Sequence, residues 1–331
     1  MLDVREELYN VIPDYTVDQP GPKTITKESL LCRLCDKESE KFEVVSTRLR
    51  DYDNPKYAVV CCPKCTLTQL FPTPSFEDIS KFYDNDLQAK AIWPTSDNFQ
   101  KIIEKKYQPD HLRRKLWVES CLRPSNEPRV LDAGCGYGFF VNQLSQHGFN
   151  AIGIDLSKQR IKIAREKGNG TFLNGDIDAN FVSKYYESFD GVTSFHVLEH
   201  LTNPVKSVLS LIALVKKGGS IFIEVPNLND ELINQIPQYA YHQWQFGHMS
   251  YFNKKTLEIL MERCNIKNFE IKGVQRYGLD HLLKWSKEGK PDLSMPDDQS
   301  QNLLFNEIER NYRIKREKRL SCDTLILTIE K

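Results

Sequence analysis

The C-terminal two thirds of the chain alternate short apolar runs with segments of helical periodicity. The apolar runs are bounded by glycine and by polar residues, which is typical of buried strands. They cover residues 129–132, 151–155, 171–174, 191–195 and 220–225. Parallel strands need crossover helices between them, so the alternation predicts an α/β fold with a doubly wound, mostly parallel sheet.

Three of the intervening helices have clear boundaries. The first runs from Phe139 to His147 and is closed by Gly148. The second starts after an N-cap at Ser157 and stops before Gly168. The third, at about 204–215, has an apolar face and ends in two lysines and two glycines. Each helix therefore has a local start or stop signal in addition to its period.

Residues 269–274 and 324–329 supply the last two of seven expected strands, as an antiparallel pair at the sheet edge. The segment 275–323 between them is an expected helical insertion. Its end, 302–319, has the pattern of a charged amphipathic helix. We expect that charge to lie on a solvated face rather than to bind phosphate.

The N-terminal part has a different pattern. Prolines in the first 30 residues disfavour regular structure there. We divide the chain into an arm (1–30), a cysteine-rich module (31–74), a helical linker region (75–126) that is interrupted at Pro94 and Pro109, and a main domain (127–331).

The composition of the chain disfavours several classes of protein. The 331 residues contain 45 lysines and arginines and 45 aspartates and glutamates, so the net charge is zero. A dedicated nucleic-acid-binding protein would normally be basic. The N-terminus lacks the apolar run of a signal peptide, and no segment approaches the roughly 18 apolar residues that span a bilayer. We expect a cytoplasmic protein with a small-molecule substrate.

Four of the nine cysteines form two Cys-x-x-Cys pairs, Cys32 with Cys35 and Cys62 with Cys65. In a reducing compartment this spacing predicts a closed, structural zinc site. Cys61 is an alternative ligand to Cys62, although its spacing fits less well, and unrelated free thiols are the simpler alternative. The other four cysteines are scattered and are expected to pack in the core.

The loop after the first strand carries the strongest chemical signal. Asp132 ends that strand, Gly134, Gly136 and Gly138 follow at alternate positions, and Asp155 ends the next strand. Glycines let the backbone approach a ligand, and a carboxylate at Asp155 accepts ribose hydroxyls. The motif that binds NAD has two residues between its second and third glycines, whereas the glycines here are evenly spaced. A carboxylate at Asp132 would also repel the pyrophosphate of NAD, but it could hold an ammonium group. The sequence therefore favours a nucleoside that carries an amino acid, and NAD is the alternative ligand.

This stretch resembles the motif of class I S-adenosylmethionine-dependent methyltransferases. Residues 174–177, 194–201 and 216–227 match later parts of the same pattern, and together they cover about 129–274. The resemblance implies the Rossmann-like, seven-stranded methyltransferase fold. It also implies cofactor contacts at Asp132, Gly134, Gly136, Gly138, Asp155, Leu156, Asp176, Ile177 and His196.

The four-cysteine module and residues 247–252 resemble bacterial sugar methyltransferases. In the sugar C-methyltransferases among them, a Tyr-x-Glu-His run supplies a histidine base. Here Gln245-Phe246-Gly247-His248 keeps only the histidine. Because breaking a C–H bond needs more support than deprotonating a hydroxyl, this difference favours O-methylation over C-methylation.

His248 is the first candidate for the general base, followed by His196 and His200. Glu199 and His200 have an alternative role in bonding backbone at the start of their helix. We expect Tyr83, Glu199, Tyr241, His242 and Trp244 to contact substrate.

The sequence thus predicts a methyltransferase of a nucleotide-linked or glycan-derived sugar, in surface polysaccharide or deoxysugar biosynthesis. The alternatives are a sugar C-methyltransferase, an RNA-modifying methyltransferase with a zinc adaptor, and a non-catalytic subunit.

Overall fold

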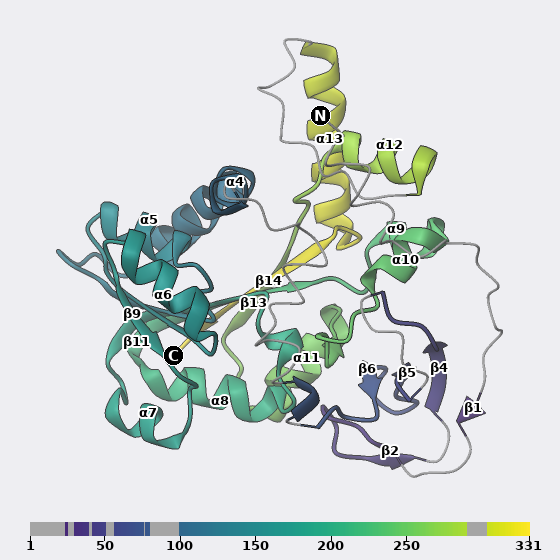
Figure 1. Ribbon diagram of the computed structural model, residues 1–331, viewed down its shortest axis with the longest axis horizontal. Coiled ribbons are helices and arrows are strands. Elements are labelled where there is room, and N and C mark those ends of the chain that lie inside the picture. Colours follow the sequence, from purple (N-terminus) through teal and green to yellow (C-terminus); the bar gives the residue numbers. More distant parts are fainter. Residues whose placement is uncertain are drawn as a thin grey trace.

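The computed structural model describes residues 24–25, 30–39, 42–50, 56–75, 77–79, 99–289 and 303–331. Within these ranges, a large twisted sheet carries helices on both faces, and a smaller sheet lies beside it (Figure 1). The elements before the large sheet are β1 (Thr24–Ile25), β2 (Leu30–Leu31), β3 (Glu38–Ser39), β4 (Phe42–Ser46), β5 (Ala58–Cys61), β6 (Thr68–Phe71) and α4 (Phe99–Cys121).

The large sheet confirms the predicted fold class. Its strands are β7 (Arg129–Ala133), β8 (Asn150–Asp155), β9 (Thr171–Asn174), β10 (Phe189–Phe195), β11 (Val215–Pro226), β13 (Phe269–Val274) and β14 (Thr324–Glu330). They are arranged in the order β13-β14-β11-β10-β7-β8-β9. β8 and β9 lie on one side of β7, whereas β10 lies on its other side. An open α/β sheet binds its ligands at the carboxyl ends of two strands related in this way, here β7 and β10.

The last two strands form the predicted antiparallel pair at one edge of the sheet. β14 lies between β11 and β13 and pairs antiparallel with both, and β13 is the edge strand. β13 therefore runs in the same direction as the five parallel strands. Leu325, Leu327 and Ile329 of β14 are buried in the core.

Three helices on the sheet begin and end close to the predicted residues: α5 (Phe139–Gln146), α6 (Lys158–Lys167) and α8 (Pro204–Leu214). The others are α7 (Ala179–Lys184), the short 3-10 helix η1 (Leu198–His200) and α11 (Lys254–Arg263). Ser157 caps α6 by accepting a hydrogen bond from the backbone N–H of Arg160, as the sequence predicted. Figure 1 shows α4, α5 and α6 on one face of the sheet and α7 and α8 on the other.

Helix α4 corrects the predicted interruption at Pro109. The helix continues through this proline for a further three turns. A proline inside a helix removes one backbone hydrogen bond. Packing of α4 against the sheet offsets that loss, because Val118 is fully buried and the Trp117 indole donates to Thr328 of β14. Pro94 lies outside the described residues.

The segment between β13 and β14 contains the predicted helical insertion. Its described helices are α12 (Leu279–Glu288) and α13 (Leu303–Arg319). Part of the charge on α13 is structural, because the buried Arg316 guanidinium bonds to Asp230. Asp230 in turn caps α9 (Glu231–Gln235), which is followed by α10 (Pro237–Gln243).

The smaller sheet crosses the predicted boundary at residue 74. Its strand order is β1-β4-β5-β6-β12, and β12 is Ser250–Tyr251 from the C-terminal half of the chain. The two halves are therefore joined by backbone hydrogen bonds between Tyr251 and Thr68 and between their neighbours. Strands β2 and β3 form a separate hairpin at the cysteine turns.

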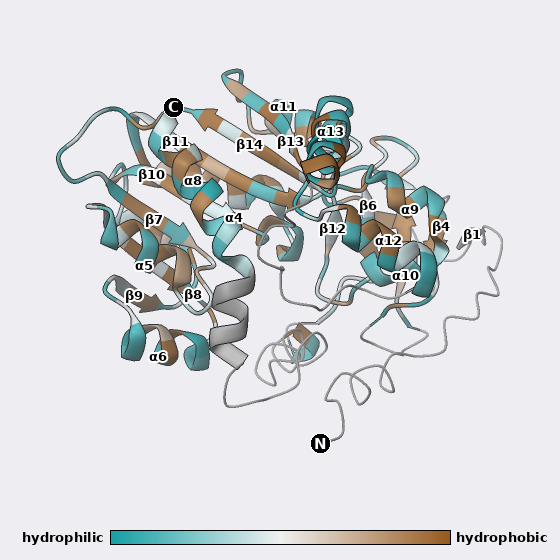
Figure 2. Cartoon of the chain, turned by 90° about the horizontal axis from the view of Figure 1, so that it is seen from above, coloured by the Kyte–Doolittle hydropathy of each residue, from teal (hydrophilic) through white to brown (hydrophobic). Residues whose placement is uncertain are grey.

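Apolar side chains gather where the layers meet. In Figure 2 the inward faces of the strands and helices are brown, and teal residues line the outside. Each large side chain buried in this way stabilises the fold by about 1.5–3 kcal/mol relative to exposure. In the described ranges, no helix is both long enough and apolar enough to cross a membrane.

Candidate functional site

The glycine loop after β7 is held by packing at two positions and open at the third. A Cβ on Gly134 would lie 2.3 Å from Val197 Cγ2, and one on Gly138 would lie 2.4 Å from the Phe172 ring. Gly136 also has a positive φ, of 55°, yet a Cβ there would meet no atom within 4 Å. The backbone at Gly136 thus borders open space at the end of β7.

Asp155 and Leu156 lie beside this open space. The Asp155 carboxylate accepts hydrogen bonds from the backbone N–H of Gly136, at 2.9 Å, and from that of Ser157, at 2.8 Å. A carboxylate has about four acceptor positions, so it retains capacity for two hydroxyls. Leu156 leaves 63% of its surface exposed, which is unusual for leucine and offers an apolar surface next to that carboxylate.

Asp132 is buried behind the same loop. Burial raises the pKa of its carboxyl to about 6, and a hydrogen bond from Thr193 Oγ1, at 2.7 Å, works in the opposite direction. Thr193 lies opposite Asp132 on β10. A buried carboxylate of this kind gains stability from a cationic partner such as an ammonium.

Asp176 and Ile177 complete this edge after β9. Asp176 is exposed, and its carboxylate accepts a hydrogen bond from the backbone N–H of Ile177. We call the loops 134–138, 155–156 and 176–177, together with Asp132, the cofactor edge. Its open space at Gly136, its acceptor oxygens and its exposed leucine fit a nucleoside that carries an ammonium group.

His196 follows β10 and lies next to the cofactor edge, because the neighbouring Val197 packs on Gly134. Its backbone has a φ of 55°, a strained value for a residue other than glycine. Nε2 lies 3.0 Å from Glu224 Oε1, and Nδ1 lies 3.5 Å from Glu199 Oε1. Strain of this kind persists only where the surroundings hold it, and here the hydrogen-bonded Glu224 carboxylate holds the imidazole.

Glu224 is a central residue of this site that sequence reasoning missed. It is fully buried in β11 and accepts hydrogen bonds from Arg113 and Arg114 of α4, at 2.7 and 2.6 Å, as well as contacting His196. Burial works to raise its pKa, but the two guanidinium groups and His196 outweigh it and hold the pKa well below the ordinary value. The available signal was a charged residue within an otherwise apolar strand.

Arg276 extends the network from the other side. Its Nη1 lies 2.9 Å from His196 Nε2, while its Nε and Nη2 donate to Asp110 of α4 at 2.8 and 2.7 Å. Asp323 fixes the Arg276 backbone by accepting its N–H. The predicted linker helix and the end of β13 thus both contribute charged groups to the space around His196.

Glu199, His200 and His248 form a tight buried group next to His196. One ligand atom from each lies within 4.8 Å of the others. His200 Nδ1 bonds to the Gly247 carbonyl at 2.8 Å, and the His200 and His248 rings meet edge to face at 4.8 Å. Burial lowers the pKa of His248 to about 3, so this imidazole is neutral at physiological pH. We call His196, Glu199, His200, His248 and Glu224 the histidine cluster.

The predicted acceptor aromatics lie at the junction with the smaller sheet. The Tyr241 hydroxyl donates to the Leu49 carbonyl, and His242 Nε2 lies 2.7 Å from Arg50. Trp244 is buried against Tyr251, and its carbonyl accepts from the Arg50 N–H. These contacts give the three residues a packing role, and their contact with substrate stays a prediction. Tyr83 lies outside the described residues.

The four cysteines of the two predicted pairs come together. Sγ of Cys32 lies 3.4 Å from that of Cys65, and Sγ of Cys35 lies 3.8 Å from that of Cys62. A tetrahedral zinc ion with bonds of about 2.3 Å needs sulfur atoms about 3.8 Å apart, so the four thiols fit one ion. Cys61 is not part of this group, because its Sγ faces the Thr66 carbonyl.

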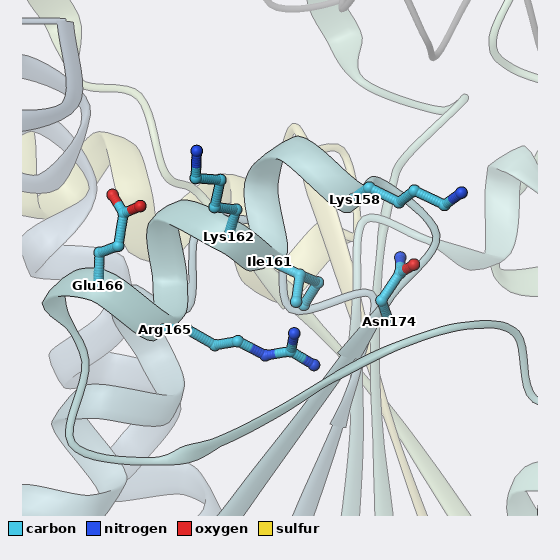
Figure 3. A pocket seen from close by; sticks show the side chains of 6 residues that line it. All are labelled: Lys158, Ile161, Lys162, Arg165, Glu166 and Asn174. Atoms are coloured by element: carbon cyan, nitrogen blue, oxygen red, sulfur yellow. The ribbon is translucent and has the colours of Figure 1, made fainter.

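A separate pocket opens on the outer side of α6 and is lined by Lys158, Ile161, Lys162, Arg165, Glu166 and Asn174 (Figure 3). It contains no residue of the predicted site. Arg165 is already bonded to the Phe172 carbonyl, and the Asn174 amide donates to the carbonyls of Asp155 and Leu156. Asn174 therefore supports the cofactor edge from behind.

Comparison with known proteins agrees with this geometry. A family model described as "Methyltransferase domain" matches residues 99–271. A ubiquinone biosynthesis O-methyltransferase of Coxiella burnetii is 30% identical over 173 residues, which cover 48% of this chain and 72% of that protein. One from Vibrio cholerae is 30% identical over 160 residues, covering 46% of this chain but only 60% of its own length.

Among solved structures, an S-adenosylmethionine-dependent methyltransferase from Archaeoglobus fulgidus is similar with a TM-score of 0.47 and 20% identity, over 70% of this chain and 99% of that one. The family match takes in more than half of the chain and includes the whole cofactor edge. The chain belongs to the methyltransferase domain family and is an S-adenosylmethionine-dependent methyltransferase.

Proposed function

We propose that this protein methylates a hydroxyl group of a nucleotide-linked or glycan-derived sugar, with His196 as the general base. The observation that carries the proposal is the placement of His196. It lies next to the glycine loop, and 24% of its side chain is exposed, against 11% for His200, while His248 is buried with 6% of the residue exposed. Among the three candidate histidines, His196 is therefore the most accessible to an acceptor.

The hydrogen bonds of His196 support this role. Nε2 lies 3.0 Å from the ionised Glu224 carboxylate and 2.9 Å from Nη1 of Arg276, so it donates to Glu224 when it is protonated and accepts from the guanidinium when it is not. Glu224 also stabilises the imidazolium that forms when the base takes a proton, in the way that a buried carboxylate supports a histidine base.

The reaction then needs little else from the chain. S-adenosylmethionine supplies a methyl group that is already activated on a sulfonium. Asp132, Gly136 and Asp155 would hold and orient the cofactor, and the His196 imidazole would take the hydroxyl proton as the oxygen–carbon bond forms. Alignment of this kind is the main source of rate for such a displacement.

The choice of oxygen as acceptor has two supports. The relatives reported above are named as O-methyltransferases. The chain also lacks the glutamate and tyrosine that precede the histidine base in the sugar C-methyltransferases it resembles. The sugar itself is proposed from the resemblance of the cysteine module and residues 247–252, and the phenolic hydroxyl of a ubiquinone precursor is the second candidate, favoured by the names of the relatives.

For the cysteine module we propose a structural zinc ion held by Cys32, Cys35, Cys62 and Cys65. Four sulfur ligands close the coordination sphere, so this ion would stabilise the module rather than activate a substrate. The four sulfur atoms lie within 4.8 Å of one another and three of the cysteines are buried, so several thiolates there would repel each other without a metal ion.

The test is incubation with methyl-labelled S-adenosylmethionine and three acceptor classes: nucleotide sugars, glycan fragments and a catechol. We expect label in an O-methyl sugar, identified by mass spectrometry and NMR. Exclusive labelling of the catechol would contradict the sugar assignment. Loss of deuterium from a carbon-deuterated sugar would show C-methylation instead of O-methylation.

A further inference from the structure

We propose that Glu199, His200 and His248 form a second metal site, which binds Zn²⁺ or a similar first-row transition-metal ion. The site is separate from the four cysteines and uses none of their residues. The inference does not depend on the identity of the methyl acceptor.

The first argument is the state of Glu199. Its side chain is 2% exposed, and neither carboxylate oxygen has a hydrogen-bond partner among the described residues. Buried carboxylates are normally paired or hydrogen-bonded, because removing a charge from water without compensation is costly. His196 Nδ1 lies 3.5 Å and His200 Nε2 3.9 Å from Glu199 Oε1, both longer than an ordinary hydrogen bond. A divalent ion between Glu199 and the imidazoles would supply the missing partner.

The second argument is the orientation of His200. Its Nδ1 bonds to the backbone carbonyl of Gly247 at 2.8 Å, so its lone pair is on Nε2, the nitrogen that faces Glu199. Histidines that bind metals commonly donate their other ring N–H to a backbone carbonyl in this way. Gly247 directly precedes His248, so one loop both orients His200 and supplies the third ligand.

The donor set indicates the class of ion. Two imidazoles and one carboxylate are typical of zinc and of other first-row transition metals, whereas Mg²⁺ and Ca²⁺ prefer oxygen ligands. Tetrahedral bonds of about 2.0–2.1 Å require donor atoms about 3.4 Å apart. The three ligand atoms lie within 4.8 Å of one another, with Glu199 Oε1 and His200 Nε2 3.9 Å apart, so small side-chain rotations that shorten these distances would complete the site.

The position of the proposed metal site indicates that the ion would connect two segments of the chain. Glu199 and His200 lie on η1, directly after His196, while His248 leads into β12, which pairs with β6 of the smaller sheet. An ion here would join the loop that carries His196 to the strand that anchors the cysteine module. It would act as a positioning element for His196.

The test measures metal content of the full chain by elemental analysis after removal of loosely bound ions. We expect two equivalents of metal per chain in the wild type and one in Glu199→Gln and in His248→Gln. Matched controls are Glu270→Gln on β13 and His147→Gln after α5, both remote and exposed, which should keep two equivalents. One equivalent in the wild type, or two in both cluster variants, would overturn the proposal.

Cobalt substitution separates a lost site from a misfolded chain. We expect the first equivalent of Co²⁺ to give the intense thiolate charge-transfer absorption of the cysteine site, and a second to add only weaker bands of nitrogen and oxygen ligands. A folded Glu199→Gln variant should show the first signal and lose the second. Absence of the second signal in the wild type would refute the site even if the variants fail to fold. Calorimetric binding of S-adenosylmethionine, measured alongside, should be unchanged, so a failure of the proposed methyl transfer is detected separately.

Discussion

The cofactor edge and the histidine cluster meet at the carboxyl ends of neighbouring strands but are built in different ways. The cofactor edge uses three consecutive loops between residues 132 and 177, and much of its chemistry is backbone geometry at glycines. The histidine cluster uses side chains from residues 196 to 248 and is held by arginines from α4 and by Arg276. The comparison teaches that the part matching the methyltransferase pattern is local in sequence, while the part that we propose faces the acceptor is assembled from distant segments.

The largest expected effect comes from replacing His196, which should impair catalysis but leave cofactor binding nearly unchanged. We expect His196→Asn to lower kcat by about 10²- to 10⁴-fold, the usual contribution of a general base. The dissociation constant for S-adenosylmethionine should change less than threefold, because no residue of the cofactor edge is altered. Single-turnover kinetics and calorimetry measure the two quantities. An equal loss in both would mean that the two regions are not separable.

A second prediction uses the pH dependence of the cofactor edge. Burial raises the pKa of Asp132 to about 6, so in the absence of cofactor its carboxyl becomes neutral as the pH falls below that value. An ammonium binds the ionised form, so proton and cofactor compete. We expect the affinity for S-adenosylmethionine to fall up to tenfold per pH unit below about 6 and to be level above it.

The control for this prediction is Asp132→Asn, which should bind the cofactor weakly and with no such slope between pH 5 and 7. Calorimetry in buffers of different pH measures both chains. A wild-type affinity that is constant down to pH 5 would show that Asp132 does not hold the ammonium.

The smallest expected effect tests whether the open space at Gly136 belongs to the cofactor. An alanine there meets no protein atom, so its cost to stability is limited to the positive φ, about 1–2 kcal/mol. Its methyl group would occupy the space that we assign to the cofactor, and we expect about a tenfold weaker affinity, equivalent to about 1.4 kcal/mol. The matched variant Gly134→Ala adds the steric conflict with Val197 and should lose more stability in urea unfolding. Unchanged cofactor affinity in folded Gly136→Ala would place the cofactor elsewhere.

Several parts of the structure follow from short stretches of sequence. The seven strands and helices α5, α6 and α8 were predicted within about three residues in most cases, since each has an apolar period and a local start or stop signal. The two Cys-x-x-Cys turns also met as predicted, and the spacing correctly favoured Cys62 over Cys61. In each case the deciding residues lie within one turn or one strand of each other.

Other parts depended on packing between distant segments. The continuation of α4 through Pro109 is stabilised by Trp117 and Val118 against the sheet, and β14 is held inside the sheet by pairing with both β11 and β13. The role of Glu224 was hidden for the same reason, because its partners are Arg113 and Arg114, more than 100 positions earlier.

The sequence by itself determined the fold class, the glycine loop after β7 and the four-cysteine group, because strand periods, glycine conformations and turn spacings act over a few residues. Only the tertiary structure decided which histidine is accessible, that Glu199 is buried without a hydrogen-bond partner among the described residues, and that β12 joins the two sheets. Burial and pairing depend on what other segments place around a side chain. No local pattern around His196, Glu199 or His248 carries that information.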